Sequence, residues 1–331
     1  MTMARIAIIG AGNMGRAHAA AWASLGEDVA YVCAPRVEEP LPGAEGARIV
    51  HDLDTVLEDP AVDIVSVCTP TDSHTDIAVR ALASGRNVLL EKPIALEIPD
   101  ALAIRAAAAS SRGILMVAHV VRFFPGYERV DEAVAGGVIG RPWSAHAERL
   151  TSGGAAPAWL GQERRSGGIL VDFAIHDFDQ LNLLLGEPLA VTSVGSTGAA
   201  VETTIEYRDG GIGRVLTSMA LPAGYPFSSA LDVIGSAGSV RYAYSAPDSG
   251  TPGLSDYRET SAHGETRARV TGEDPYARQA EYFLHCIESQ TAPSRSPVEA
   301  AIAALRVSRA AHRSLSTGQR VVLDALDLSA D

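Results

Sequence analysis

The sequence predicts an α/β fold of two domains, in which a parallel sheet comes first and an antiparallel sheet follows. A short apolar run, residues 6–9, leads directly into closely spaced glycines and then a helical pattern. Apolar strands and amphipathic helices alternate up to about residue 122, which is typical of parallel strands joined by crossover helices. Beyond this point, strand-like runs separated by glycine-containing turns indicate an antiparallel sheet, and residues 246–272 look irregular. The predicted domains are residues 1–122 and 123–331.

The glycines Gly10, Gly12 and Gly15 have the spacing G-x-G-x-x-G between the first strand and the first helix. The first allows a tight turn, the second lets the backbone approach a pyrophosphate, and the third lets the helix pack closely on the strand. Unpaired N–H groups at the start of a helix can bind phosphates. The sequence therefore predicts a dinucleotide site here, with Asn13 and Met14 at its helical side.

The end of the second strand, residues 29–33, bears on which dinucleotide binds. An Asp or Glu at this place normally binds the ribose hydroxyls of NAD. This chain has Ala34 and Pro35 there, followed by Arg36, which can hold a 2′-phosphate. We therefore expect NADP as the preferred cofactor, with NAD as the alternative if Arg36 is only a solvated loop residue.

Two further apolar strands end in polar residues that we expect to line the cofactor, because ligands of open α/β sheets bind beyond the carboxyl ends of the strands. Thr69, Pro70 and His74 follow one strand, and Glu91 and Lys92 end the next. A lysine in this position can polarise a substrate oxygen or exchange a proton with it. The alternative is an exposed lysine paired with Glu91.

The second domain contains one pattern that suggests acid–base chemistry. Asp172 and His176 are four residues apart in a predicted helix over residues 167–186, and so share a face. The carboxylate could orient the imidazole, leaving the ring to exchange a proton with substrate. The alternative is a plain surface pair. Residues 151–167 are expected to form a loop over the site. Further candidate substrate contacts are Arg122, Phe123, Tyr127 and Trp159.

Composition narrows the function classes. Apolar residues make up 47% of the 331 residues, charged residues 20%, and the formal net charge is −13. This acidity argues against nucleic acid and anionic membranes as partners. Cys33, Cys68 and Cys286 form no C-x-x-C pair, so we expect reduced thiols and no metal site. With no predicted signal peptide and no apolar run of about 20 residues, we expect a cytoplasmic protein.

Four segments carry a family resemblance: GAGNMGRAH, CTPTDSHTDIAVRALASGRNVLLEKP, AHVVRFFPGY and GGILVDFAIHDFDQLNLLLG, in that order. Together they resemble the glucose–fructose oxidoreductase / inositol dehydrogenase (Gfo/Idh/MocA) family, over the whole chain. The resemblance implies an N-terminal Rossmann dinucleotide-binding domain and a C-terminal α/β domain with a large open, mainly antiparallel sheet. It also implies that the final helix and strand pack back near the first domain. Homodimers or homotetramers through the C-terminal sheet are expected.

The resemblance further implies an NAD(P)-dependent oxidoreductase that acts on a sugar, cyclitol or related polyol. Lys92, Asp172 and His176 match the family's catalytic residues, and the Lys92–Pro93 peptide is expected to be cis. Phe124 stands where many relatives carry Asp, which suggests a less hydroxylated substrate. Two other functions stay open: a nicotinamide-dependent glycosidase or lyase with no net redox change, and a cofactor-binding sensor without turnover.

Overall fold

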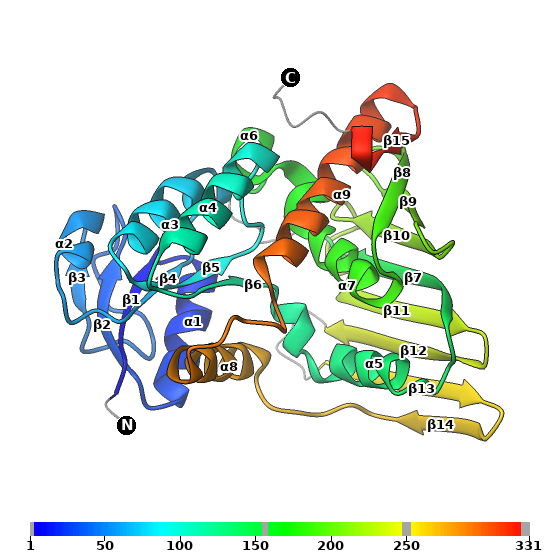
Figure 1. Ribbon diagram of the computed structural model, residues 1–331, viewed down its shortest axis with the longest axis horizontal. Helices are drawn as coiled ribbons and strands as arrows, with labels where there is room; N and C mark the ends of the chain where they lie inside the picture. The colour runs from blue at the N-terminus through cyan, green and yellow to red at the C-terminus, as the bar shows by residue number, and fades with distance from the viewer. Residues whose placement is uncertain (1–2, 154–157, 247–252, 326–331) are drawn as a thin grey trace. The chain divides into compact units, whose positions relative to one another are not determined.

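The computed structural model describes residues 3–153, 158–246 and 253–325. Contacts within the chain divide it into two compact units (Figure 1). The first unit contains the residues up to Phe123 together with Glu273–Ile302, and the second contains Phe124–Gly272 together with the residues from Ala303 onward. The domain division predicted from the sequence stays a proposal. The structure adds that Glu273–Ile302, late in the chain, belongs to the first unit.

The first unit is built on a six-stranded parallel sheet of order β3-β2-β1-β4-β5-β6. Strands β1, β4, β5 and β6 are almost entirely buried, as expected for parallel strands that are covered on both faces. The strand order reverses between β1 and β4, which creates a topological switch point where ligands of such folds bind. The strands are β1 (Arg5–Ile9), β2 (Asp28–Cys33), β3 (Arg48–Val50), β4 (Ile64–Val67), β5 (Asn87–Glu91) and β6 (Leu115–Ala118).

Helices cover both faces of this sheet: α3 and α4 lie on one side and α1 and α8 on the other (Figure 1). Two short 3₁₀ segments, Thr71–Ser73 and Val120–Phe123, follow β4 and β6. The helices are α1 (Asn13–Ser24), α2 (Leu53–Leu57), α3 (His74–Ala83), α4 (Ile98–Ser110) and α8 (Pro275–Ser289).

The second unit is built on a nine-stranded sheet of order β14-β13-β12-β11-β7-β10-β9-β8-β15, antiparallel except between β7 and β10. This confirms the predicted fold class. The final strand, β15, pairs with β8 at one edge. The strands are β7 (Pro142–Leu150), β8 (Pro188–Gly195), β9 (Val201–Tyr207), β10 (Ile212–Ser218), β11 (Phe227–Gly235), β12 (Gly238–Ala246), β13 (Leu254–Ser261), β14 (Gly264–Ala268) and β15 (Val321–Val322).

Two helices of the second unit, α5 and α7, pack on its sheet, α5 against β12 and α7 against β7 and β10. Along β7, Ala145, Ala147 and Arg149 are buried on the face that α7 covers, whereas the alternate residues are partly exposed. The helices are α5 (Pro125–Ala135), α6 (Glu163–Ser166), α7 (Ile175–Leu185) and most of α9 (Val298–Thr317), with a π-helical turn at Ile169–Phe173 and a 3₁₀ turn at Leu323–Ala325.

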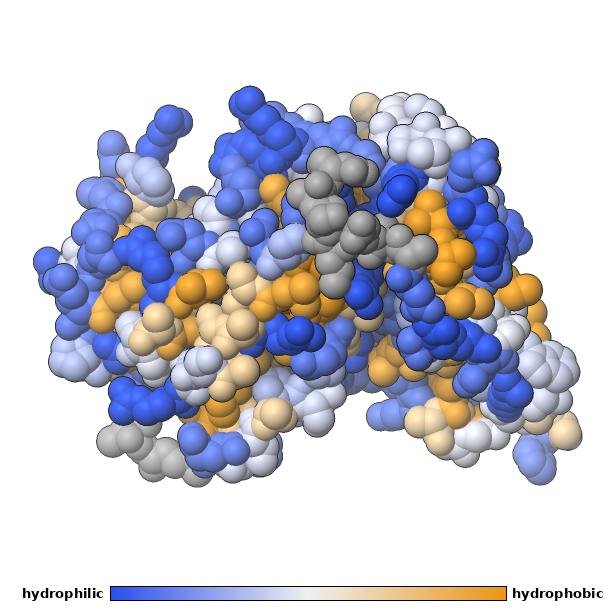
Figure 2. All heavy atoms as spheres, turned by 45° about the horizontal axis from the view of Figure 1, so that its top comes forward, coloured by the Kyte–Doolittle hydropathy of each residue, from blue (hydrophilic) through white to orange (hydrophobic). Residues whose placement is uncertain are grey.

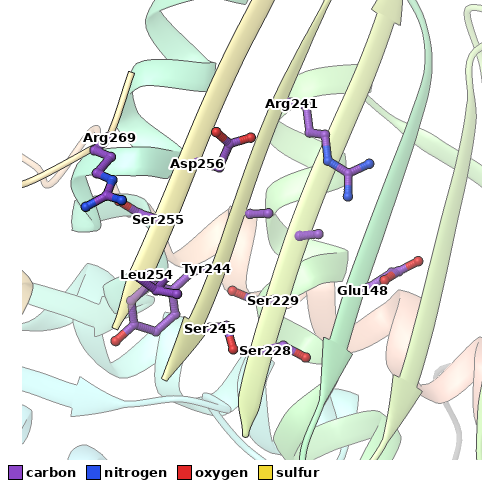
Figure 3. Close-up of a pocket in the computed structure, with 12 residues that line it drawn as sticks. Glu148, Ser228, Ser229, Arg241, Tyr244, Ser245, Leu254, Ser255, Asp256 and Arg269 are labelled. Carbon is purple, nitrogen blue, oxygen red and sulfur yellow. The ribbon is translucent and has the colours of Figure 1, made fainter. Parts of the chain in front are cut away.

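The opposite face of the nine-stranded sheet is called the open face below. The strand register places Ile212 and Ile234 beside Ser144 on this face, and both are about half exposed. A hollow of about 480 Å³ lies on the open face, where Glu148, Arg241 and Asp256 project from neighbouring strands (Figure 3). The predicted site residues are not among the described residues that line it.

Two local expectations differ from the structure. Residues 246–272, which were expected to be irregular, contain the β13–β14 hairpin. The sequence pattern did not reveal these strands because they are polar and mostly exposed, and Tyr257 is the one residue in them that is completely buried. The predicted continuous helix over residues 167–186 begins as a π-helical turn and continues as α7. Residues 154–157, in the expected loop, and 247–252 lie outside the described residues.

Hydrophilic side chains predominate on the face shown in Figure 2, with smaller apolar patches between them. None of the helices in the described part of the chain has the length and apolar character required to cross a bilayer.

Candidate active site

The glycine turn between β1 and α1 requires two of its glycines for the fold itself. Gly10 has φ +106°, and a Cβ there would lie 2.5 Å from the carbonyl oxygen of Cys68. A Cβ on Gly15 would lie 2.0 Å from the carbonyl oxygen of Gly10. Gly12 differs, because no described atom lies within 4 Å of the position its Cβ would take. Its lack of a side chain therefore leaves open space that the fold does not use.

This open space lies at the N-terminus of α1. Gly12 is the N-cap residue and provides no side-chain acceptor, so the first N–H groups of the helix have no side-chain cap. Asn13 is exposed and Met14 half-buried in the first turn. Uncapped donors beside an open backbone fit a pyrophosphate.

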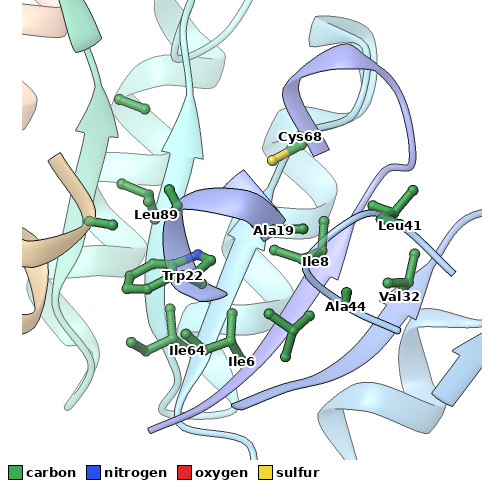
Figure 4. Packing of buried hydrophobic residues seen from close by; sticks show 14 of the residues in the cluster. Ile6, Ile8, Ala19, Trp22, Val32, Leu41, Ala44, Ile64, Cys68 and Leu89 are labelled. Atoms are coloured by element: carbon green, nitrogen blue, oxygen red, sulfur yellow. The ribbon is translucent and has the colours of Figure 1, made fainter. Parts of the chain in front are cut away.

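Packing in the first unit holds α1 firmly on the sheet. Trp22 is fully buried among Ile6, Ile64 and Leu89 (Figure 4). Helix α8 adds Phe283 to the same cluster. Truncating one large aromatic in such a cluster costs about 3–5 kcal/mol, so the glycine turn has a rigid support.

The residues after β4 lie next to the glycine turn, because β4 pairs with β1. Thr69 and Pro70 are half-buried, and the Thr69 hydroxyl accepts a hydrogen bond from Ser73. His74 is buried: its Nδ1 lies 2.8 Å from the carbonyl oxygen of Pro93, and its Nε2 lies 3.0 Å from that of Thr69. Burial lowers the pKa of His74. The ring therefore links the end of β4 to the segment after β5, and its predicted contact with the cofactor stays a prediction.

Arg36 follows β2 in an exposed turn. The nearby carbonyl oxygen of Ala34 is bound by Nδ1 of His51 at 2.9 Å, which ties the end of β2 to the end of β3. Arg36 is thus exposed two residues beyond this tie, and its predicted contact with the cofactor stays a prediction.

Lys92 directly follows β5 and is half-buried. The Lys92–Pro93 peptide is cis, as predicted. The chain has 27 lysine and arginine residues together, and Lys92 is the only lysine; the remaining 26 are arginines. A guanidinium stays protonated, whereas an ammonium is compact and can lose its proton. Every other lysine-or-arginine position of the chain is an arginine, so the amine at this position indicates a specific role for Lys92. This signal is present in the sequence but was not used to predict the site.

Glu91 makes its observed contacts within the first unit, and its predicted contact with the cofactor stays a prediction. Its Oε1 lies 2.9 Å from Nε2 of His18, and its Oε2 accepts the backbone N–H of Lys92 at 3.1 Å. His18 also lies 2.7 Å from the Ser66 hydroxyl through Nδ1. Burial alone lowers the pKa of His18, but Cys68 and Glu91 beside it raise the pKa to about 10. The pair is therefore ionic at neutral pH, and sequence reasoning did not identify His18.

Asp172 and His176 belong to the second unit. Asp172 lies in the π-helical turn and His176 in the first turn of α7, and both are half-buried. The N–H of Ala174 bonds to the carbonyl of Ile169, five residues back, so the two side chains are not related by regular α-helical spacing. Single π turns inside helices often occur at functional sites.

A buried ion pair anchors the start of α7 to the sheet. Arg149 of β7 donates to both carboxylate oxygens of Asp177, at 2.8 and 2.9 Å. Tyr127, 2% exposed, lies 3.5 Å from Arg149 and packs edge-on against Tyr242. Tyr127 therefore belongs to the core of the second unit, and the substrate contact expected for it stays a prediction.

The other three expected substrate contacts, Arg122, Phe123 and Trp159, have different surroundings. Arg122 is 5% exposed and donates through Nη1 to the carbonyl oxygen of Arg295 at 2.9 Å, while the Arg295 guanidinium lies 4.1 Å from the ring centre of Phe123. Arg122 therefore ties two segments of the first unit together. Trp159 is half-buried in a turn of the second unit, and its predicted role stays a prediction.

Comparisons with known proteins agree with this geometry. A family model described as "Oxidoreductase family, NAD-binding Rossmann fold" matches residues 4–119, and one described as "Oxidoreductase family, C-terminal alpha/beta domain" matches residues 131–323. Inositol 2-dehydrogenase of Rhizobium meliloti (strain 1021) is 30% identical over 96% of this chain and 98% of that protein. The scyllo-inositol 2-dehydrogenase (NAD(+)) of Bacillus subtilis (strain 168) is 28% identical over 97% and 96%.

Among solved structures, levoglucosan dehydrogenase in complex with NADH and L-sorbose superposes with a TM-score of 0.85. It covers 98% of this chain and 99% of that one at 20% identity, and so shows the same fold. The glycine turn, the sheet topologies and the two family matches lead to one conclusion: the chain belongs to the Gfo/Idh/MocA oxidoreductase family, with an NAD-binding Rossmann fold followed by its C-terminal α/β domain.

Proposed function

We propose that the chain is an NAD(P)-dependent dehydrogenase that oxidises a secondary alcohol of a sugar or cyclitol, or reduces the corresponding ketone. The observation that carries this is Lys92, the only lysine of the chain, which follows β5 at the same carboxyl edge of the parallel sheet as the dinucleotide cradle after β1. The names of the inositol and levoglucosan dehydrogenases among its relatives support the substrate class.

The cradle for the dinucleotide is the open space at Gly12 with the uncapped start of α1, and when bound the nicotinamide supplies a hydride acceptor or donor. Lys92 would stabilise negative charge that develops on the substrate oxygen. His176 would take the hydroxyl proton during oxidation and return it during reduction. Asp172 would favour the charged form of that imidazole.

These roles are tested by turnover with a panel of sugars and cyclitols, followed by absorbance of the reduced nicotinamide. Lys92→Ala and His176→Ala should each lower kcat about 100-fold or more while dinucleotide binding is nearly unchanged. His285→Ala, at an exposed position of α8, is the matched control and should keep wild-type kcat. Retained turnover in both Lys92→Ala and His176→Ala would overturn the assignment.

For the cofactor we propose a preference for NADP over NAD. Arg36 is exposed directly after β2, and Cys33 and Ala34 supply no carboxylate for a ribose. We expect NADPH to bind more tightly than NADH, and Arg36→Ala to reduce the difference by weakening NADPH binding alone. Equal dissociation constants for the two in the unmodified protein would contradict the preference.

We also propose that the chain assembles as a homodimer or homotetramer through the open face. Ile234 and Leu254 are exposed there among charged side chains, and apolar patches rimmed by polar residues mark interaction sites. Light scattering should give a mass of two or four chains, and Ile234→Lys should lower it. A monomeric unmodified protein would contradict this. The cytoplasmic location stays a prediction.

A further inference from the structure

Helix α1 carries both the uncapped start that fits a pyrophosphate and a buried histidine. His18 lies in the second turn of this helix and is 2% exposed. Its Nε2 is 2.9 Å from Oε1 of Glu91, which is 4% exposed at the end of β5. The helix that would respond to the cofactor is thus joined by a buried ion pair to β5, the strand that directly precedes Lys92.

The same carboxylate continues the connection to the backbone of Lys92. Oε2 of Glu91 accepts the Lys92 N–H at 3.1 Å. On the other side of the cis peptide, His74 lies 2.8 Å from the carbonyl oxygen of Pro93. The Lys92–Pro93 segment is therefore held from two directions by buried side chains, and the connection through Glu91 leads to α1.

Stability alone does not explain an ion pair at this place. Two buried charges lose their hydration, and well-packed apolar residues of similar volume are often as stable or more so. The remaining partners also fix the geometry: Ser66 lies 2.7 Å from Nδ1 of His18, and the Tyr276 ring of α8 lies 6.4 Å from the imidazole. Charged, directional contacts specify position more strictly than apolar packing does.

We propose that the His18–Glu91 pair is a positioning device that couples dinucleotide binding at the start of α1 to the position of Lys92. The inference rests on the proposed function, because it assumes that a dinucleotide binds at the glycine turn and that Lys92 acts on the substrate. His18 and Glu91 are positioning residues, since neither touches the reacting atoms and both act through Lys92.

The single lysine makes a direct test possible. Protein labelled with [¹⁵N]lysine has one labelled backbone amide, that of Lys92, which donates to Glu91. The probes are ADP-ribose and its 2′-phosphate, which have the pyrophosphate but lack the nicotinamide ring that would otherwise affect Lys92 directly. Each probe's binding is measured by calorimetry on the same samples.

Whichever of the two probes binds should shift the NMR signal of the Lys92 backbone amide in the unmodified protein. In His18→Asn and in Glu91→Gln, the probe should still bind, but the shift should be much smaller. His285→Asn, the exposed control on α8, should behave like the unmodified protein. Binding without a shift in the unmodified protein, or an undiminished shift in both variants, overturns the coupling. If neither ADP-ribose nor its 2′-phosphate binds, the proposed function itself is overturned, so the two failures are distinguishable.

Kinetics supply a second readout that general damage would not reproduce. His18→Asn should lower kcat about tenfold with little change in KM for the dinucleotide, as expected for lost positioning of a group acting in the transition state. In a Lys92→Ala background the same substitution should have almost no further effect on the residual kcat. An equal decrease in both backgrounds means that His18 does not act through Lys92. Glu91→Gln keeps the size of the side chain and an acceptor for the Lys92 N–H. Its kcat should therefore lie between that of His18→Asn and that of the unmodified protein.

Discussion

The ammonium of Lys92 is expected to do what a guanidinium cannot. Lys92→Arg keeps the positive charge but brings a larger, planar group that does not release its proton. We predict that kcat falls about 100-fold or more while dinucleotide affinity stays close to wild type. Arg105→Lys, at an exposed position of α4, is the reciprocal control and should leave both unchanged. Near-normal turnover of Lys92→Arg would show that charge alone suffices.

His18 gives a second residue-level prediction, on stability against pH. Its pKa is about 10 in the folded protein and near 6.5 ordinarily, because Cys68 and Glu91 outweigh burial. The stabilisation is therefore complete below pH 6.5 and is lost as the pH rises to about 10. Urea unfolding of the unmodified protein and His18→Asn should show a difference in unfolding free energy that shrinks over this range. A constant difference from pH 6.5 to 10 would contradict the ion pair.

Residue identities were easier to predict than residue orientations. The glycines and Lys92 followed from spacing and from their position at strand ends. The inward direction of Glu91, His74 and Arg122 did not, because it depends on which tertiary partner each side chain meets. One signal existed for His18: it lies three residues after Gly15, on the face of α1 that packs on the sheet.

At the level of elements, the glycines of the turn between β1 and α1 have different purposes: the fold requires Gly15, whereas Gly12 leaves space for a ligand. Gly12→Ala meets no described atom and has φ −77°, so it should lower the unfolding free energy by no more than about 1 kcal/mol. It should nevertheless weaken dinucleotide binding about tenfold or more, because the methyl group occupies the space for the pyrophosphate.

Gly15→Ala is the comparison variant, because its Cβ would lie 2.0 Å from the Gly10 oxygen and should lower the melting temperature strongly. Calorimetric titration and thermal unfolding of both variants check this pair of predictions. Equal dinucleotide affinity of Gly12→Ala and the unmodified protein would mean that the dinucleotide does not use this space.

The start of α7 depends on the buried pair of Arg149 and Asp177. Asp177→Asn leaves the guanidinium buried without its counter-charge, which should cost about 3–5 kcal/mol of unfolding free energy. Glu265→Gln removes one partner of an exposed pair with Arg267 in the same unit and should have little effect. Chemical denaturation measures both. Equal effects of the two substitutions would contradict the anchoring role.

Regular elements were predictable where periodicity was strong, as in β1, α1, β4 and β5. The π-helical turn at Ile169–Phe173 was not, since its widened geometry depends on local packing and leaves the apolar pattern helical. The β13–β14 hairpin was missed for the opposite reason. Its strands bury few side chains, so they lack the alternation that identifies a half-buried strand.

At the scale of the whole molecule, the residues proposed for cofactor binding and catalysis are distributed over the two units. The dinucleotide cradle and Lys92 belong to the first, and Asp172 and His176 to the second. Each unit was predictable as a fold class because its strands and helices follow one architecture. The return of Glu273–Ile302 to the first unit was not, because it depends on the long-range packing of α8 against α1.

Direct transfer of hydride is the central claim, and isotope labelling tests it most directly. The substrate is a sugar or cyclitol that the panel identifies, deuterated at the reacting secondary carbon and incubated with oxidised dinucleotide. The account predicts that the deuterium appears on C4 of the reduced nicotinamide, and that Lys92→Ala and His176→Ala slow its appearance. Deuterium that stays in the product or passes to water, with no label on the nicotinamide, would contradict the account.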